Sequence, residues 1–275
     1  MNFYKNRFLS DFIWRFILQD PRLRLRLTRL LVKDEDRQIE LFGSPLYVNS
    51  IKEIGYINAE RNNQSNIVAR DEVASIINLA LLLEPRDTFV DIGANVGLYS
   101  SILGRMKHLF PAVVYYAFEA NPDTHARLRR TLTGLPIQTE CIALSDREGK
   151  LAFCAGAVSG AFGSRSTASD PDFQIPDAMV EVAAKRLDQF PLQGQSLILK
   201  IDVEGHEWEV LQGAQRFFHE VRIKAVYLDG YKDARIPGFL HDLGFSRFDG
   251  RTLENPPKQN FSVLWIHRDW IRRSA

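Results

Sequence analysis

Residues 89–100, which read FVDIGANVGLYS, hold the residue types best suited to bind a polar ligand. An apolar run ends near Asp91, a short loop with Gly93 and Gly97 follows, and a helix is expected directly afterwards. Glycines let the backbone approach a flat ligand closely, and the amides at a helix N-terminus favour a negative group such as a carboxylate. The pattern predicts a nucleoside-bearing cofactor at the carboxyl end of a parallel strand.

The spacing of this loop favours one kind of cofactor. Dinucleotide-binding loops read G-x-G-x-x-G, whereas this loop reads Gly93-x-x-x-Gly97 and carries Asp91 at its mouth. A carboxylate there adds little to a pyrophosphate site but suits a cationic ammonium, such as that of S-adenosylmethionine. A second apolar run, 112–118, ends in Glu119, whose carboxylate can accept hydrogen bonds from both ribose hydroxyls. The alternative is an ordinary α/β turn with surface acids.

Polar residues also follow the apolar run 196–201, in the sequence Asp-Val-Glu-Gly-His. Methyl transfer from a sulfonium mainly requires alignment of nucleophile, carbon and sulfur, but a hydroxyl acceptor must also lose its proton. We expect Asp202, Glu204 and His206 to be catalytic, because the first two can face the cleft and histidine has a suitable intrinsic pKa. Alternatively, Glu204 stabilises a helix N-terminus and the ring of His206 points to solvent.

A carboxylate pair raises the question of a metal. Asp229 ends the apolar run 223–228 and lies, with Asp202, at the tip of a neighbouring strand. Metal-dependent O-methyltransferases hold Mg²⁺ with acids at such places. Because Gly230 follows Asp229 where a further oxygen ligand would help, we expect no metal site.

Strands and helices alternate along most of the chain. The apolar runs predict strands at 88–92, 112–118, 137–143, 196–202 and 223–228, and the periodicity predicts helices at 97–107, 122–133, 205–219 and 236–243. A further helix, capped by Asp71, is expected before Pro85. This alternation predicts an α/β fold with a parallel sheet and helices on both faces. The last two strands, 245–248 and 261–266, are separated only by a polar loop, so they are expected to pair antiparallel.

Two segments fall outside this alternation. Residues 1–33 carry mostly basic charges and apolar residues at helical spacing, divided by Pro21, which predicts two short helices. They either pack on the core or on a second subunit, or contact an anionic membrane surface. Residues 34–70 predict a short hairpin and a loop. Residues 154–181, rich in Gly, Ala and Ser, are expected to form a long loop that is either a lid or a flexible surface segment.

Composition excludes several classes of protein. The 275 residues are 45% apolar and 25% charged, as in ordinary globular proteins, and a net charge of +1 gives no bulk electrostatic case for nucleic acid. No apolar run is long enough to span a membrane, and Arg15 interrupts the only candidate for a signal peptide. The two cysteines have no metal or redox spacing, which fits a cytoplasmic protein.

Four motifs together resemble one family. The segments VDIGANVG, YAFEANP, IALSDREG and, most specifically, LKIDVEGHEWEVLQGA at 199–214 resemble the FkbM family of S-adenosylmethionine-dependent methyltransferases, over about residues 68–267. The resemblance implies a seven-stranded, mostly parallel methyltransferase (Rossmann-like) sheet ending in an antiparallel hairpin. It implies that Asp91, Gly93, Asn95 and Gly97 line the methionine end of the cofactor, that Glu119 holds the ribose, and that Ser145 and Asp146 lie beside the adenine.

We therefore expect an N-terminal helical and hairpin extension at 1–67 and a methyltransferase domain at 68–275. The resemblance implies O-methylation of a hydroxyl on a sugar, glycan or secondary metabolite, with S-adenosylmethionine as donor. The partners expected are a small-molecule or glycan acceptor, no nucleic acid, possible peripheral membrane contact through 1–33, and a possible oligomer. Two other classes of function remain open from the residues: a nicotinamide-dependent oxidoreductase and a non-catalytic cofactor-binding scaffold.

Overall fold

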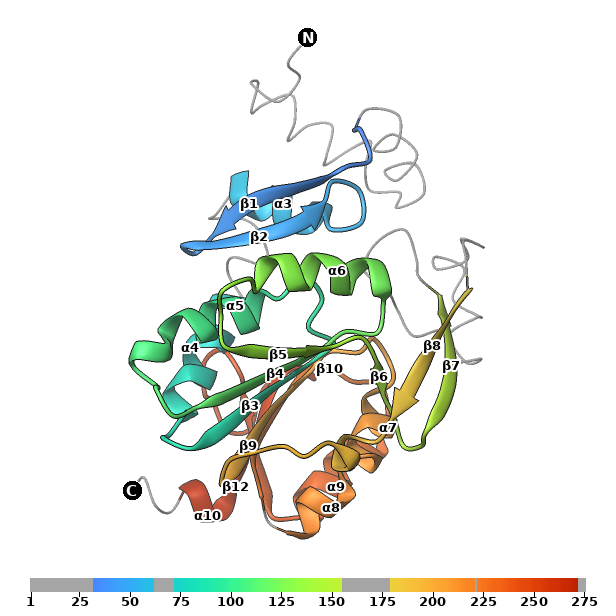
Figure 1. The fold of residues 1–275 in the computed structure, drawn as a ribbon. Coiled ribbons are helices and arrows are strands. Elements are labelled where there is room, and N and C mark those ends of the chain that lie inside the picture. Colours follow the sequence, from blue (N-terminus) through green and yellow to red (C-terminus); the bar gives the residue numbers. More distant parts are fainter. Residues whose placement is uncertain (1–31, 62–71, 155–178, 221, 272–275) are drawn as a thin grey trace.

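A seven-stranded sheet organises the computed structural model, which describes residues 32–61, 72–154, 179–220 and 222–271 (Figure 1). The strand order is β11-β12-β10-β9-β3-β4-β5. Only β12 runs antiparallel to its neighbours, so the expected mostly parallel sheet with an antiparallel hairpin at its end is confirmed. The strands are β3 (Asp87–Ile92), β4 (Val114–Phe118), β5 (Ile137–Glu140), β9 (Ser196–Ile201), β10 (Ile223–Gly230), β11 (Phe245–Asp249) and β12 (Phe261–His267).

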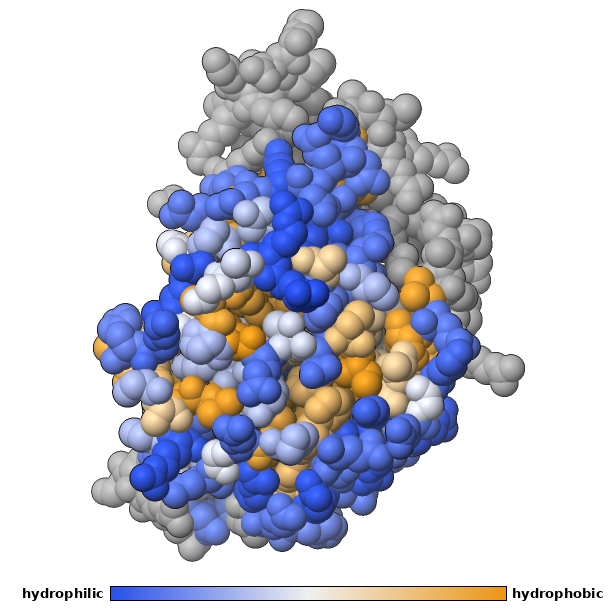
Figure 2. Space-filling view, viewed as in Figure 1, coloured by the Kyte–Doolittle hydropathy of each residue, from blue (hydrophilic) through white to orange (hydrophobic). Residues whose placement is uncertain are grey.

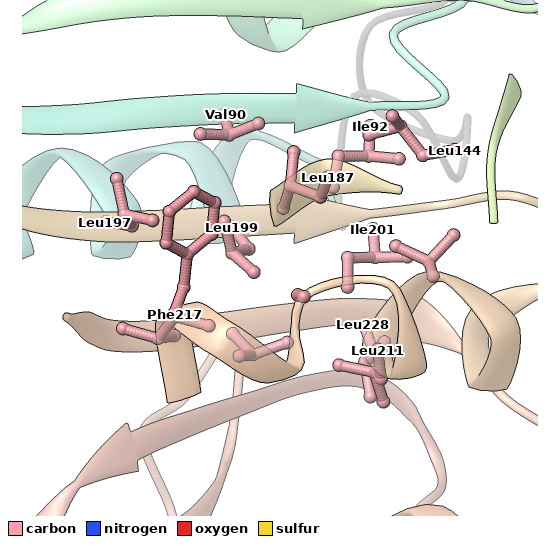
Figure 3. Close-up of a cluster of buried hydrophobic side chains, with 14 of the residues drawn as sticks. Val90, Ile92, Leu144, Leu187, Leu197, Leu199, Ile201, Leu211, Phe217 and Leu228 are labelled. Atoms are coloured by element: carbon pink, nitrogen blue, oxygen red, sulfur yellow. The ribbon is translucent and has the colours of Figure 1, made fainter. Parts of the chain in front are cut away.

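Helices cover both faces of this sheet, because its central strands are apolar on both sides. Phe89 and Ile198 point to one face, where they join the cluster that includes side chains of α4 and α5. Val90 and Leu199 point to the other face and pack with residues of α7 and α8 (Figure 3). The helices of the first layer are α4 (Val73–Leu82), α5 (Leu98–Arg105) and α6 (Pro122–Thr131); those of the second are η4 (Leu187–Gln189), α7 (Glu207–Gln212), α8 (Gln215–His219) and α9 (Arg235–Asp242). Two short elements complete the set, η3 (Met106–His108) and α10 (Arg268–Ile271).

One predicted helix is broken in two, and one predicted strand ends early. The helix expected at 205–219 is broken into α7 and α8, and the break brings Gly213 against β6, where a Cβ would lie 2.0 Å from the carbonyl oxygen of Ser145. The strand expected at 137–143 ends at Glu140. Its last residue belongs instead to a different sheet, because Ala143 pairs with Ala184.

That second sheet was not predicted. It consists of β6 (Ala143–Leu144), β7 (Gly149–Cys154) and β8 (Met179–Lys185), in the order β6-β8-β7. The two ends of the segment 154–181 are therefore strand rather than loop, and β7 and β8 pair antiparallel. Residues 155–178, the rest of the expected lid, lie outside the described residues.

The hairpin expected within 34–70 is present. It consists of β1 (Asp36–Leu41) and β2 (Ser44–Asn49), is followed by α3 (Ile54–Arg61), and lies against α6 (Figure 1). A buried ion pair fixes this position, since the Arg127 guanidinium of α6 donates to the Glu53 carboxylate at 2.8 Å. The two helices expected in 1–33, their proposed membrane contact and the Asp71 cap fall on residues 1–31 and 71, outside the described part of the chain.

The surface of the described residues is mixed. On the face shown in Figure 2, hydrophobic residues gather over the centre and hydrophilic residues surround them. None of the described helices combines the length and apolar character that crossing a bilayer requires.

Candidate active site

A cavity of about 280 Å³ opens where four neighbouring strands, β4, β3, β9 and β10, reach their carboxyl ends. Ligands of open α/β sheets bind at this edge. The cavity is lined by backbone of the loop after β3, by apolar residues near β6, and by six acidic side chains. Its described acidic lining residues are Glu53, Glu72, Glu119, Asp202, Glu204 and Asp229.

The loop after β3 lies against the tip of β9. Gly93 has φ +70°, and a Cβ there would lie 1.9 Å from the carbonyl oxygen of Asp202, so only glycine fits. Its amide and that of Ala94 both donate to the carbonyl of Phe118. The loop backbone is therefore fixed to two strands, and Gly93 and Asn95 line the cavity.

Glu119, at the tip of β4, is held by the backbone. One carboxylate oxygen accepts from the amide of Asn95 at 2.9 Å, and the other accepts from the amide of Asn121 at 2.8 Å. Burial raises the pKa of Glu119 to about 7, although both amide donors act to lower it. Its carboxylate is thus fixed at the cavity wall, with lone pairs left over for a ligand.

Asp91 lies beneath the cavity rather than in its wall. The side chain is fully buried; one oxygen accepts from the Ser100 hydroxyl at 2.7 Å and the other lies 3.2 Å from the Lys200 ammonium. Lys200 also donates to the carbonyl of Gly93 at 2.8 Å and lies 3.5 Å from the Asp202 carboxylate. Burial alone would lower the pKa of Lys200, but Asp91 and Asp202 hold it well above its ordinary value.

Carboxylates crowd the other end of the cavity. Asp202 and Glu204 follow β9, Asp229 lies near the end of β10, and Glu72 precedes α4. Partial burial, together with Asp202 and Asp229, raises the pKa of Glu204 to about 7. Glu204 has φ +52°, a left-handed conformation that is strained for a glutamate and that clusters at functional sites.

Two buried tyrosines lie behind these carboxylates. Tyr99 of α5 makes a side-chain hydrogen bond with Glu72, and its hydroxyl lies 3.4 Å from that of Tyr227 on β10. The Tyr227 hydroxyl lies 3.3 Å from the Asp229 carboxylate and 3.1 Å from the Ser262 hydroxyl. These contacts link the acidic end of the cavity to the antiparallel strand β12.

The structure brings together only part of the predicted site. Gly93, Asn95, Glu119, Asp202 and Glu204 line the cavity. The other predicted residues, Asp91, Gly97, Ser145, Asp146 and His206, are not among its described lining residues.

Those five have other surroundings. Gly97 has φ +90° and a Cβ there would lie 2.6 Å from Leu128, so it allows α5 and α6 to pack closely. The ring of His206 lies 3.0 Å from the Ser145 hydroxyl, which in turn lies 3.1 Å from the Asp146 carboxylate. Burial lowers the pKa of His206 and favours its neutral form.

Three residues in or near the cavity were missed from the sequence. Tyr56 and Glu72 come from helical segments that precede the motif-bearing strands, where no spacing distinguishes them from surface residues. Lys200 did carry a signal: it is a lysine within SLILKI, a strand that is buried throughout, and such a lysine requires a buried acid as partner.

Comparisons with known proteins find similarity to methyltransferases. The family model of the methyltransferase FkbM domain matches residues 91–247, from the end of β3 into β11. The hexuronic acid methyltransferase AglP of Haloferax volcanii is 25% identical over 203 residues, which cover 72% of this chain and 75% of that protein.

Solved structures with a similar arrangement are more distant. A precorrin-6y C5,15-methyltransferase from Geobacter metallireducens is 16% identical, with a TM-score of 0.39 over 74% of this chain and 89% of that one. A TehB-like SAM-dependent methyltransferase from Corynebacterium glutamicum is 10% identical, with a TM-score of 0.39 over 78% and 98%.

The family match covers more than half of the 275 residues and includes four of the strand tips around the cavity. It favours methyl transfer over the nicotinamide-dependent and scaffold alternatives. The chain therefore belongs to the FkbM family and is an S-adenosylmethionine-dependent methyltransferase.

Proposed function

We propose that the chain methylates a hydroxyl oxygen of a sugar, glycan or secondary metabolite, and that the cavity at the tips of β4, β3, β9 and β10 holds S-adenosylmethionine. The observation that carries the cofactor site is Glu119, whose two carboxylate oxygens are fixed by backbone amides at the cavity wall. A carboxylate so placed can accept from two neighbouring ribose hydroxyls without reorganising.

The charge of the cavity supports a cationic donor. Six acidic side chains line it, whereas Lys52 is its one basic residue among the described lining, and Lys52 already pairs with Asp123 at 3.2 Å. S-adenosylmethionine brings a sulfonium and an ammonium, and both are favoured by nearby carboxylates. Gly93 supplies the close backbone approach beside them.

The acceptor end is proposed to lie at Asp202 and Glu204. Both line the cavity, and both are near enough to the β9 tip to face an acceptor beside the methyl group. In this proposal Asp202 aligns the acceptor hydroxyl, and Glu204 is a candidate to take its proton because burial brings its pKa to about 7. A catalytic role for His206 stays a prediction. Its ring makes a hydrogen bond with Ser145, the residue that follows β6.

The nature of the acceptor is supported by a relative. AglP, by its name, methylates a hexuronic acid. We propose that this chain likewise accepts a sugar-like molecule, with residues 52–56 of the N-terminal extension forming part of the wall around it.

Isothermal titration tests the cofactor site. We expect S-adenosylhomocysteine to bind, and Glu119→Ala to weaken it by about 1–3 kcal/mol because the ribose hydroxyls lose a charged acceptor. Glu140→Gln, on the exposed side of β5, is the matched control and should leave affinity unchanged. Unchanged affinity in folded Glu119→Ala would remove Glu119 from the site, and tight binding of NAD instead would contradict the proposed cofactor.

A further inference from the structure

Glu72 differs from Glu53, Glu119 and Asp202 of the cavity in how its carboxylate is bonded. Asp91 and Asp202 share the Lys200 ammonium, Glu53 pairs with Arg127, and Glu119 accepts two amide protons. Glu72 accepts from one tyrosine hydroxyl, that of Tyr99, while its Oε2 atom is buried without a hydrogen-bond partner among the described residues. Such an oxygen is costly to bury in its charged form.

Among the residues that the structure describes, the charged and titratable groups that face Glu72 come from four elements. They are Tyr56 on α3, Tyr99 on α5, Lys200 and Asp202 at the end of β9, and Tyr227 and Asp229 on β10. The single ammonium among them is already shared by Asp91 and Asp202. Burial, with Asp229 next, therefore raises the pKa of Glu72 to about 7.

Methyl transfer changes the charge beside this group. The acceptor oxygen forms a bond to the methyl carbon, the carbon–sulfur bond breaks, and its electron pair stays on sulfur. The sulfonium cation becomes a neutral thioether, and the acceptor hydroxyl releases its proton. The cavity thus loses one positive charge at the moment when one proton needs an acceptor.

We propose that Glu72 follows the charge of the cofactor, so that it is deprotonated while the cavity holds S-adenosylmethionine and regains the partial protonation of the empty cavity once transfer leaves S-adenosylhomocysteine. This rests on the proposed cofactor site. Uptake of this proton then offsets part of the positive charge that the cavity loses with the sulfonium. Glu72 acts through the field at the sulfur and needs no contact with the acceptor.

The inference makes cofactor binding proton-coupled in a way that depends on the ligand. A carboxyl group with a pKa of about 7 is half protonated at pH 7, so binding the cation should release about half a proton from Glu72. S-adenosylhomocysteine lacks the sulfonium and should release less. Glu119 contributes equally for both ligands, since both carry the same ribose, and it cancels in the difference.

Isothermal titration of the full chain measures this difference without an acceptor. Each ligand is titrated at pH 7 in two buffers of different ionisation enthalpy, and the dependence of the observed heat on the buffer gives the protons released. We expect S-adenosylmethionine to release about half a proton more than S-adenosylhomocysteine.

Three variants assign the proton. Glu72→Gln keeps the shape and the acceptor for Tyr99, and it should abolish the difference. Glu140→Gln alters an exposed side chain that is not among the described lining residues of the cavity, and it should leave the difference unchanged. Glu204→Gln removes the other acidic-end carboxyl with a pKa of about 7 and should leave most of the difference in place. Loss of the difference in Glu204→Gln but not in Glu72→Gln would overturn the assignment to Glu72.

A second measurement uses the unaltered protein. The preference for S-adenosylmethionine over S-adenosylhomocysteine should rise severalfold from pH 6 to pH 8, as Glu72 ionises. A preference that is constant with pH, while both ligands bind, would overturn this inference and leave the cofactor site intact. Failure of both ligands to bind would instead overturn the proposed cofactor site, and this inference with it.

Discussion

The two ends of the cavity hold carboxyl groups with the same raised pKa but with different hydrogen-bond partners. Burial brings both Glu119 and Glu72 to about 7. At Glu119 two backbone amides fix both oxygens, whereas Glu72 has one tyrosine hydroxyl and one oxygen without a partner among the described residues. Backbone donors fix where a carboxylate lies, while an incompletely bonded carboxylate among other acids responds to the charge of its ligand. Glu119 therefore has a fixed position at one end of the cavity, whereas the protonation of Glu72 at the other end is proposed to follow the charge of the ligand.

The largest effect should come from removing the buried cation that pairs with Asp91 and with Asp202 at the acidic end. Lys200→Met leaves the buried Asp91 without its ammonium and Asp202 without its neighbour. We expect the free energy of unfolding to fall by about 3–5 kcal/mol, measured by urea denaturation at pH 7. Lys150→Met, which breaks the exposed pair with Glu181, is the control and should cost under about 1 kcal/mol. Equal losses of unfolding free energy in the two variants would mean that the buried pairs of Lys200 stabilise the fold no more than an exposed ion pair does.

The second effect concerns the loop that joins the two ends. Gly93→Ala places a Cβ within 1.9 Å of the Asp202 carbonyl oxygen at a positive φ. We expect a loss of about 2–4 kcal/mol in stability and loss of cofactor binding at ordinary concentrations. Gly238→Ala, in α9 with no atom within 4 Å of the added Cβ, should be neutral or stabilising. Wild-type affinity in Gly93→Ala would show that the loop can move away from β9.

Glutamine substitutions compare the two ends directly. A carboxyl group whose pKa rises from about 4.3 unfolded to about 7 folded loses stability as the pH rises through that window. Glu72→Gln removes this cost, so the variant should be about 1–2 kcal/mol more stable than the wild type at pH 8 and equal to it near pH 4. Glu119→Gln should show no such gain, because an amide nitrogen would face the amide of Asn95 or Asn121. A gain in both variants would remove the distinction between the ends.

The smallest effect is the pH dependence of product affinity. S-adenosylhomocysteine should bind up to about tenfold more weakly at pH 6 than at pH 8, because protonated Glu119 loses an acceptor for the ribose. Titrations across this range in the wild type and in Glu72→Gln should give the same dependence. If the pH dependence of S-adenosylhomocysteine affinity disappears in Glu72→Gln, then Glu72 and not Glu119 is the group whose ionisation controls this affinity.

The sheet and the placement of half of the proposed site residues at the cavity followed from sequence because strand tips are fixed by topology. An acid after an apolar run, as at Glu119 or Asp202, must lie at the carboxyl edge of a parallel sheet. Topology does not determine the orientation of a residue several positions after the strand. His206 is such a residue, and its ring contacts Ser145 rather than lining the cavity. The second sheet was missed because Gly149–Cys154 and Met179–Lys185 flank a segment rich in Gly, Ala and Ser, whose composition predicts a loop.

Glu72 and Tyr56 show a different limit. Both reach the cavity from helical segments whose positions depend on contacts far along the chain, such as that of Glu53 with Arg127. No local pattern encodes such a contact. Asp91 shows the opposite limit. Its position at the tip of the strand was predicted correctly, but the sequence did not show that its carboxylate pairs with Lys200.

The position of β12 has a consequence for how the protein is made. The strand is translated after every other strand of the described chain, yet it lies between β10 and β11. Until Phe261–His267 have left the ribosome, one side of β10 exposes unpaired amides and carbonyls, which is the kind of edge that other chains can pair with. The nascent chain therefore keeps an unpaired strand edge, prone to aggregation, beside its future active site until β12 has been synthesised. Chaperone binding during synthesis should be concentrated on chains that have emerged as far as β11 and no further.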